Sequence, residues 1–255
     1  MITPNTKLPR LRDFTSARVG LQRTGNSLPT SELLALQLAH ARAREAVHSK
    51  LDLQGLRLEL QGHKVLFARS RASDRVTYLH RPDLGRKLGD ESRELVVTRK
   101  GRFDAAFVIA DGLSARAVQL HAAPLMTATL KLLPPGDWKL APIVVVEQGR
   151  VAIGDDVGEC LGAAMSVVLI GERPGLSSAD SLGVYLSWNP HPGLTDAERN
   201  CISNIRAEGL SYAAAAAKLV FLMTESRRRK LSGVHLKDDV RLLADTDSHA
   251  AKSGE

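Results

Sequence analysis

The sequence predicts an α/β protein built on a doubly wound, mainly parallel β-sheet of the Rossmann-like kind, with a small, mostly helical N-terminal region. Two observations predict this fold. From residue 78 onward, short apolar runs rich in β-branched residues alternate with longer Ala- and Leu-rich stretches, an order typical of βαβ units. The runs are continuously apolar, as expected for strands buried on both faces of a parallel sheet. We therefore expect right-handed crossovers that place helices on both faces.

The pattern divides the chain into four segments. Residues 1–30 are polar, basic and interrupted by prolines, so they predict an extended basic arm. Residues 31–77 predict a mainly helical region, because a 3-4-3-4 apolar spacing follows Pro29-Thr30. Residues 78–235 carry the alternating pattern and form the predicted Rossmann-like domain. Residues 236–255 are polar and charged and predict a C-terminal tail.

Five strands and four helices account for the alternating pattern. The expected strands are Ala105–Ala110, Ile143–Glu147, Ser166–Gly171, Val184–Trp188 and Asn200–Ile205. The expected helices are Ser114–Leu133, Asp156–Ala163, Ser211–Leu231 and a helix opened by Pro82. The first of these helices has the length of a crossover and ends before Pro134-Pro135-Gly136.

The positive charge is concentrated in the first part of the chain. The net charge is +7, and residues 1–110 hold 20 Lys and Arg against 11 Asp and Glu. A basic arm can meet nucleic acid, an acidic partner or only water, but aromatic residues make up only 4% of the chain. Few stacking platforms for single-stranded nucleic acid are therefore present, and we expect no nucleic-acid partner. No run of 18 apolar residues occurs, so we expect a cytoplasmic protein with no membrane partner.

The strand-end loops are the predicted ligand sites, because ligands bind beyond the carboxyl ends of strands in open parallel sheets. The loop after Ile170 is the strongest candidate for a ligand site. In this loop Glu172 and Arg173 carry adjacent opposite charges between Gly171 and Pro174. Such a turn is either solvated or holds a carboxylate that accepts hydrogen bonds from a ligand. The residue pattern alone leaves both readings open.

Other patterns predict no chemistry of their own. The glycine-rich stretch at residues 149–158 matches neither a dinucleotide fingerprint nor a phosphate-binding loop. Ser114 lacks a nucleophile elbow and suits a helix N-cap instead. Neither His191 nor the pair Cys160 and Cys201 has metal-ligand spacing. We therefore predict no catalytic constellation and no metal site in this chain.

Six segments, taken in order, resemble the light (small) chain of ethanolamine ammonia-lyase. They span nearly the whole chain, apart from the first dozen residues and the tail, and six ordered matches are far more specific than any one. The segments are Ala17–Gly20 through Leu28–Thr30, Tyr78–Arg86, Asp111–Ala115, Gly149–Val151, Gly171–Gly175 and Arg199–Ile205.

The resemblance implies an adenosylcobalamin-dependent lyase in which this chain joins a larger, barrel-bearing subunit in a hetero-oligomer. In that family the small chain contacts the cofactor at positions that correspond here to Val151, Glu172 and Cys201. The implied reaction is radical deamination of ethanolamine to acetaldehyde and ammonia, with ethanolamine bound mainly by the large subunit. The family keeps the cofactor's own dimethylbenzimidazole on cobalt. That agrees with a chain whose nearest approach to a cobalt-ligating D-x-H-x-x-G motif, at residues 247–252, lacks the final Gly.

Two alternatives come from different classes. One is a self-contained α/β nucleotide-binding enzyme, which a complete dinucleotide fingerprint would distinguish. The other is a basic binding module for RNA, which a steep salt dependence of affinity would distinguish. The resemblance also leaves open whether the enzyme works in the free cytoplasm or in a bacterial microcompartment.

Overall fold

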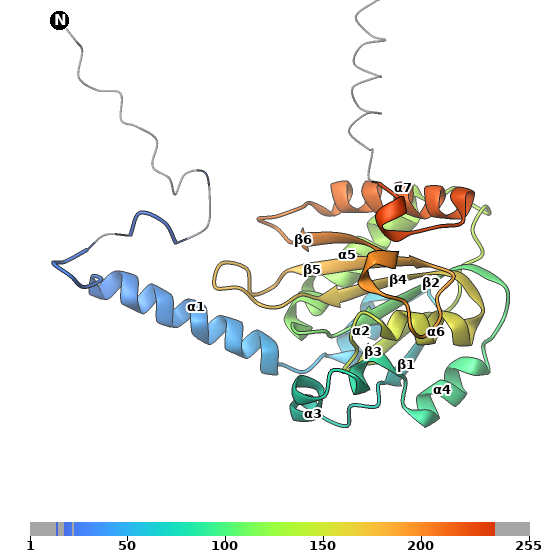
Figure 1. Cartoon of the computed structure of the whole chain (residues 1–255), viewed down its shortest axis with the longest axis horizontal. Coiled ribbons are helices and arrows are strands. Elements are labelled where there is room, and N and C mark those ends of the chain that lie inside the picture. Colours follow the sequence, from blue (N-terminus) through green and yellow to red (C-terminus); the bar gives the residue numbers. More distant parts are fainter. Residues whose placement is uncertain (1–13, 15–17, 22, 238–255) are drawn as a thin grey trace, which may run out of the picture.

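The structure is a computed structural model that describes residues 14, 18–21 and 23–237, and it contains one six-stranded sheet covered by helices (Figure 1). Most of the predicted arm at residues 1–30 and of the predicted tail at residues 236–255 lies outside the described residues, as does the near-match at residues 247–252. The predictions for those parts therefore stay predictions.

The sheet is mixed. Its strand order is β1-β3-β2-β4-β5-β6. The first four in this order are parallel, and β5 runs antiparallel to both of its neighbours. The strands are β1 (Val65–Arg69), β2 (Phe103–Ala110), β3 (Ile143–Glu147), β4 (Ala163–Gly171), β5 (Leu182–Trp188) and β6 (Arg199–Ile205).

The predicted α/β class is confirmed. A doubly wound, mainly parallel sheet of the Rossmann-like kind is not confirmed, because β5 runs antiparallel to both of its neighbours. Only residues 172–181 separate β4 from β5, and only residues 189–198 separate β5 from β6. Connections this short favour antiparallel neighbours, whereas a parallel pair needs a crossover of a dozen or more residues. The two connections therefore decide the direction of the last strands.

Helices cover both faces of the parallel strands. On the first face, α2 (Leu53–Glu59), α5 (Ala115–Leu132) and α7 (Tyr212–Arg229) enclose a core with inward side chains such as Phe107 and Leu169. On the second face, α4 (Asp90–Val97) packs against β1, and α6 (Ile153–Leu161) packs against β2 and β4. The second core includes Val108 and Val168. In the described part of the chain the short elements are α3 (Arg75–His80) and three 3-10 turns, η2 (Leu84–Arg86), η3 (Asp196–Glu198) and η4 (Gly233–His235).

The second face is open over the last two strands. The helices α5 and α7 contact β5 and β6 from the first face, whereas α4 and α6 lie over β1, β2 and β4. On this face Ser187 of β5 and Arg199 of β6 are buried, and Arg199 is hydrogen-bonded to Asp155 of α6, whereas Cys201 of β6 is exposed. This face carries the candidate site described below.

Most predicted elements are confirmed within a few residues. Ser114 caps α5 as predicted, accepting a hydrogen bond from the Ala117 N–H at 3.2 Å. The strand β1 was not predicted: it lies within residues 31–77 and joins the sheet edge. The predicted helix after Pro82 is a 3-10 turn followed by α4, and α6 begins three residues before its predicted start at Asp156.

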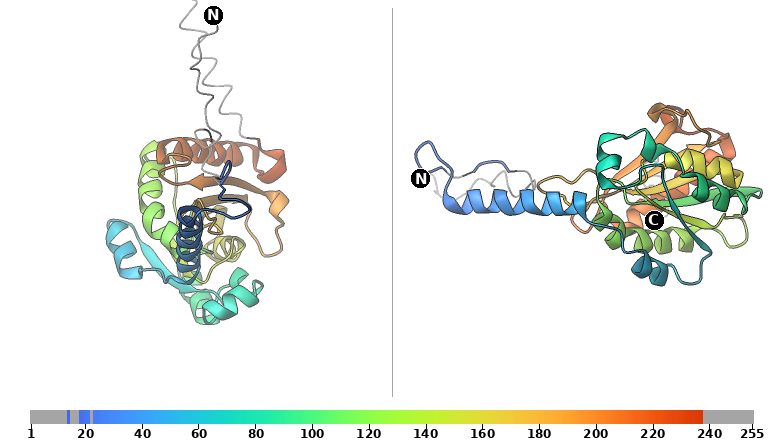
Figure 2. Two further views of the ribbon diagram at one scale, coloured as in Figure 1. Left: turned by 90° about the vertical axis from the view of Figure 1, so that its left-hand side faces the viewer. Right: turned by 90° about the horizontal axis from the view of Figure 1, so that it is seen from below.

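The first helix, α1 (Thr30–His48), projects from the body of the molecule (Figure 2). The sequence predicts this helix correctly, but the apolar spacing does not bury it, since Ala46 is its only buried residue. Leu33, Leu34 and Leu38 are 44%, 58% and 52% exposed. Among the described residues, neither α1 nor any other helix combines the length and the apolar character needed to cross a membrane.

Candidate cofactor-binding face

The three predicted site residues come from three elements on the open second face. Val151 lies between β3 and α6, Glu172 directly follows β4, and Cys201 lies within β6. Val151 and Tyr185 both pack on the core of the second face. Tyr185 is the antiparallel partner of Cys201, and directly opposed residues point to the same face of a sheet. Glu172 lies on the same side, because its carboxylate lies against Gly183, the partner of Ile170 in the core of the second face. The structure therefore places all three predicted residues on one side of the sheet.

The carboxylate of Glu172 is held through one of its two oxygens. Oε2 accepts a hydrogen bond from the Ser181 hydroxyl and another from the backbone N–H of Asn204 at 3.2 Å. Asn204 reaches this position with a left-handed backbone, φ 60°. Oε1 accepts no hydrogen bond from the described part of the chain, and it lies across Gly183, where a Cβ would come within 2.9 Å of it. One oxygen anchors the group and the other remains able to accept.

The surroundings of the Cys201 thiol favour its neutral form over the thiolate. Loss of hydration around the sulfur raises its pKa, and the nearby Glu172 carboxylate acts in the same direction, although a hydrogen bond with Tyr185 opposes it. Burial likewise raises the pKa of Tyr185, with Cys201 and Glu172 adding to the shift. A thiol with a raised pKa is a poor nucleophile and a poor metal ligand near neutral pH. The site thus offers one anion, Glu172, beside uncharged groups.

Val151 lines a groove of about 630 Å³ between the start of α6 and the loop before β6. Four cationic side chains line it against two carboxylates, Asp155 and Asp196; the cations are Arg86, Lys87, Arg150 and Arg199. Prolines complete part of its wall, namely Pro82 and Pro192. The sequence prediction included Val151 but not this basic groove.

The segment that carries Val151 is clamped to α3 and η2. The Arg150 N–H donates to the Gly85 carbonyl at 2.8 Å, and its guanidinium donates to the Tyr78 carbonyl at 2.9 Å. Arg150 also lies 4.0 Å above the Tyr78 ring, and Arg75 lies 4.6 Å from the centre of the same ring. Such cation–π contacts gain strength when they are desolvated, and Tyr78 is fully buried. The backbone before Val151 is therefore held firmly against α3 and η2.

The contacts of this segment also fill the crevice between the loops after β2 and β3. A self-contained nucleotide-binding enzyme, the first alternative, would bind its ligand in that crevice. The loops after β2 and β3 leave toward α5 and α6, on opposite faces of the sheet. A doubly wound fold binds a ligand between two such loops. Here Arg75 donates to the Gly112 carbonyl at 2.8 Å, and the buried Asp111 accepts from the Gly149 N–H at 3.1 Å. Burial raises the pKa of Asp111 to about 6. Side chains of the protein itself occupy the crevice.

Two glycines let α6 lie close to the sheet. A Cβ on Gly154 would collide with the Val168 side chain, and a Cβ on Gly158 would come within 2.8 Å of Pro190 Cβ. The glycine-rich stretch at residues 149–158, which matched no phosphate-binding pattern, is therefore explained by close helix packing. Its buried carboxylate Asp155 forms two hydrogen bonds of 2.6 Å with Arg199.

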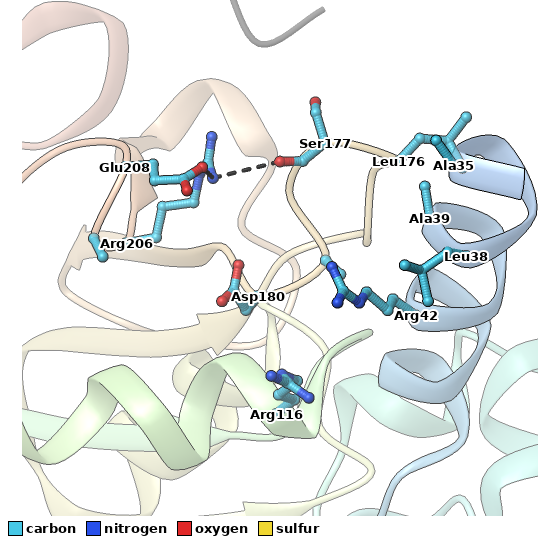
Figure 3. Close-up of a pocket in the computed structure, with 12 residues that line it drawn as sticks. Ala35, Leu38, Ala39, Arg42, Arg116, Leu176, Ser177, Asp180, Arg206 and Glu208 are labelled. Carbon is cyan, nitrogen blue, oxygen red and sulfur yellow. Dashed lines mark hydrogen bonds and ion pairs between the residues drawn. The ribbon is translucent and has the colours of Figure 1, made fainter. Parts of the chain in front are cut away.

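A second hollow, of about 450 Å³, lies between α1 and the loops that follow β4 and β6, and it contains none of the three predicted residues (Figure 3). Leu38 of α1 and Leu176 of the β4–β5 loop line it, together with Arg206, which is 8% exposed. Arg206 donates to Asn204 Oδ1 at 2.9 Å and to the Ser177 carbonyl at 3.4 Å. It thus ties the loop after Glu172 to the end of β6.

Sequence reasoning missed the residues that support the three predicted ones. Ser181, Asn204 and Tyr185 carry no recognisable pattern, and their roles appear only when β4, β5 and β6 are placed side by side. The segment Tyr78–Arg86 belonged to the resemblance, but nothing in the sequence assigned it a role. Among the described residues, no group of three or more His, Cys, Asp and Glu side chains is placed to hold a metal ion.

Comparison with known proteins gives a consistent family. The family model "Ethanolamine ammonia-lyase light chain (EutC)" matches residues 5–237. The small subunit of ethanolamine ammonia-lyase from Azotobacter vinelandii is 55% identical over 94% of this chain and 92% of its own length. The small subunit from Pseudomonas fluorescens strain Pf-5 is 52% identical over 96% of this chain and 92% of its own length. The small subunit from Pseudomonas aeruginosa strain PAO1 is 52% identical over 98% of this chain and 93% of its own length. The chain therefore belongs to the ethanolamine ammonia-lyase light-chain family and is the small subunit of that lyase.

Proposed function

We propose that this chain holds adenosylcobalamin between its open second face and the large subunit, for deamination of ethanolamine to acetaldehyde and ammonia. The observation that carries the proposal is the position of Val151, Glu172 and Cys201 on the second face of the sheet, beside the part that α4 and α6 do not cover. A small subunit implies a large partner, and an open face beside a groove suits a ligand shared between two chains.

The residues present fit a corrin. The corrin is a broad disc fringed with neutral amides, so it needs hydrogen-bond acceptors, donors and flat packing surface. Glu172 Oε1 supplies an acceptor, while Tyr185, Cys201 and Val151 supply uncharged surface. When bound, the cofactor supplies a carbon-centred radical by homolysis of its cobalt–carbon bond. The part of this chain is to orient the corrin and to keep water away from it.

The projecting helix α1 is the element of this chain that we assign to contact with the large subunit. An isolated helix of its length is marginal in water unless tertiary packing supports it, and this helix projects from the body of the molecule with Ala46 as its only buried residue (Figure 2). Its exposed leucines would be covered by a partner chain. The basic arm predicted for residues 1–30 precedes α1 and would continue this contact along the sequence.

Co-expression with the large subunit tests the proposal. The purified complex should bind adenosylcobalamin, seen as a corrinoid absorption spectrum after gel filtration, and should deaminate ethanolamine. Each subunit alone should show little or no activity. Full activity of the large subunit without this chain would contradict the proposal.

Replacing Glu172 tests the site. Glu172→Ala removes the free acceptor, and a hydrogen bond to a charged group contributes about 1.5–3 kcal/mol. We therefore expect cobalamin to bind about 10- to 100-fold more weakly, while the two subunits still co-purify. Glu91→Ala, an exposed carboxylate on α4, is the matched control. Unchanged cobalamin affinity in Glu172→Ala would remove Glu172 from the site.

A further inference from the structure

The basic groove beside Val151 has positive charge that the protein leaves uncompensated. The carboxylate of Asp155 is already bound to Arg199 through two hydrogen bonds. The other carboxylate, Asp196, is fully solvent-exposed and lies 3.6 Å from Arg199 Nε. Within the described residues, the side chains of Arg86 and Lys87 make no hydrogen bond or ion pair. Two adjacent free cations therefore line the groove.

A third cation in the groove is only partly satisfied. Arg150 donates one hydrogen bond from its guanidinium to the Tyr78 carbonyl at 2.9 Å. Its Nε is buried and has no hydrogen-bond partner among the described residues. Because a buried donor without a partner is costly, the guanidinium of Arg150 keeps hydrogen-bonding capacity that the described chain does not use.

The three cations are held in fixed relation to Val151. Gly85 accepts a hydrogen bond from the Arg150 N–H at 2.8 Å, and a Cβ on Gly85 would meet Arg150 Cγ at 2.8 Å. The backbone that carries Arg86 and Lys87 is thus fastened directly to the backbone that carries Val151. An anion in this groove would lie beside whatever Val151 contacts.

We infer that this groove binds the phosphodiester of the nucleotide loop of adenosylcobalamin, through Arg86, Lys87 and Arg150. The inference rests on the proposed function, because it assumes a corrinoid at Val151. The amides around a corrin are neutral, and the phosphodiester is the anionic group of the cofactor's periphery. Arginine and lysine are the side chains that bind phosphate most strongly, by charge-assisted hydrogen bonds. The prolines Pro82 and Pro192 give the groove stiff walls.

The test compares two corrinoids that differ in the nucleotide loop. Cobinamide has the same corrin and amides as cobalamin but no nucleotide loop and no phosphate. In the complex with the large subunit, Arg86→Gln with Lys87→Gln should weaken cobalamin binding at least 10-fold and change cobinamide binding less than twofold. Binding is followed by absorption after equilibrium dialysis.

Two further variants separate the groove from general charge. Arg86→Lys with Lys87→Arg keeps both charges and should retain cobalamin affinity within about threefold, since the phosphate contact is largely electrostatic. Arg99→Gln with Lys100→Gln changes another exposed Arg-Lys pair, which precedes β2, and should leave both affinities unchanged. Gel filtration confirms that each complex assembles.

Each result decides the inference. An equal loss of cobalamin and cobinamide, or no loss of either, in the Arg86 and Lys87 double Gln variant would overturn it. A loss of the same size in the Arg99 and Lys100 control would also overturn it, because the effect would then be due to overall charge. A wild-type complex that binds neither corrinoid would instead contradict the proposed function, so the two failures are distinguishable.

Discussion

Glu172 shows how a carboxylate can be fixed in position and still accept a ligand. Two donors hold Oε2, one from the β4–β5 loop and one from the end of β6. Gly183 leaves the space that the side chain crosses. Preorganisation of this kind reduces the entropy that is lost on binding. The same three strands place Tyr185 and Cys201 beside it, so a single anion is set in otherwise uncharged surroundings.

The charge pattern of the loop after Ile170 was enough to single out Glu172, but not to decide its role. The sequence left a solvated turn and a ligand-binding carboxylate open. The position of the carboxylate depends on Ser181 and on the left-handed Asn204, which are 9 and 32 positions away. Contacts that depend on the pairing of distant strands have no local sequence pattern, and these could not be predicted.

Thiol labelling tests whether Cys201 faces the corrin. Cys201 is exposed, whereas Cys160 is buried and its pKa is raised to about 11. Because the thiolate is the reactive form and the pKa of Cys201 is also raised, its alkylation by iodoacetamide should be slow at pH 7 and accelerate about tenfold per pH unit below that pKa. Mass spectrometry should find the label on Cys201 and none on Cys160.

Bound cobalamin should protect Cys201 from this labelling in the complex with the large subunit. Cys201→Ser provides the control, since it should take up no label under the same conditions. Equal labelling rates with and without bound cobalamin would place Cys201 away from the cofactor, whatever the activity of the complex.

At the scale of elements, α6 positions one side of the candidate site. It runs back across the second face from Val151, and Gly154 and Gly158 let it lie against Val168 and Pro190. The helix begins without a side-chain cap, which explains why its start was predicted three residues too late. The start of β4 was also predicted three residues too late, at Ser166 instead of Ala163. By contrast α5, which Ser114 caps, was predicted within one residue at each end.

The β4–β5 and β5–β6 connections explain the larger error in the fold. Apolar runs predict that β5 and β6 exist, but they do not state the direction of a strand within a sheet. Connection length carries that information, and the segments at 172–181 and 189–198 are both too short for a helical crossover. Because both strands are antiparallel to their neighbours, no further helix is needed on the second face. That face remains open for a ligand.

Gly154→Ala tests the packing of α6. Alanine favours an isolated helix over glycine by about 1 kcal/mol, so a free helix would gain stability. Here the added methyl group must displace α6 from Val168, and overpacking costs about 1–3 kcal/mol. We expect a lower free energy of unfolding in urea and weaker cobalamin binding, because Val151 shifts with the helix. Glu159→Ala, at an exposed position of α6, should not reduce either. A Gly154→Ala chain as stable as the wild type would show that the contact is relieved without cost.

At the scale of the whole molecule, the chain is a compact α/β body with one projecting helix. The body carries the open face and the basic groove, and α1 carries exposed leucines, of which Leu38 lines the hollow beside the β4–β5 loop (Figure 3). The sequence predicted α1 from its apolar spacing but implied a packed face. Spacing reports that a face is apolar and does not report which chain covers it. A subunit with two such surfaces is suited to an assembly in which a partner covers both.

The double change Leu34→Glu with Leu38→Glu tests α1 as the docking element. Both side chains are more than half exposed, so the free chain should keep its circular dichroism and its thermal unfolding. Burial of a leucine contributes about 1.5–3 kcal/mol, and two charges in an apolar contact should therefore weaken association with the large subunit by about 100-fold or more. Analytical ultracentrifugation of the mixed subunits measures this loss. Leu58→Glu, on α2 and 68% exposed, is the control for a charge placed elsewhere, and it should leave association unchanged. If the α1 variant assembles as tightly as the wild type, the large subunit binds another surface, and the exposure of α1 is a property of the complex as well.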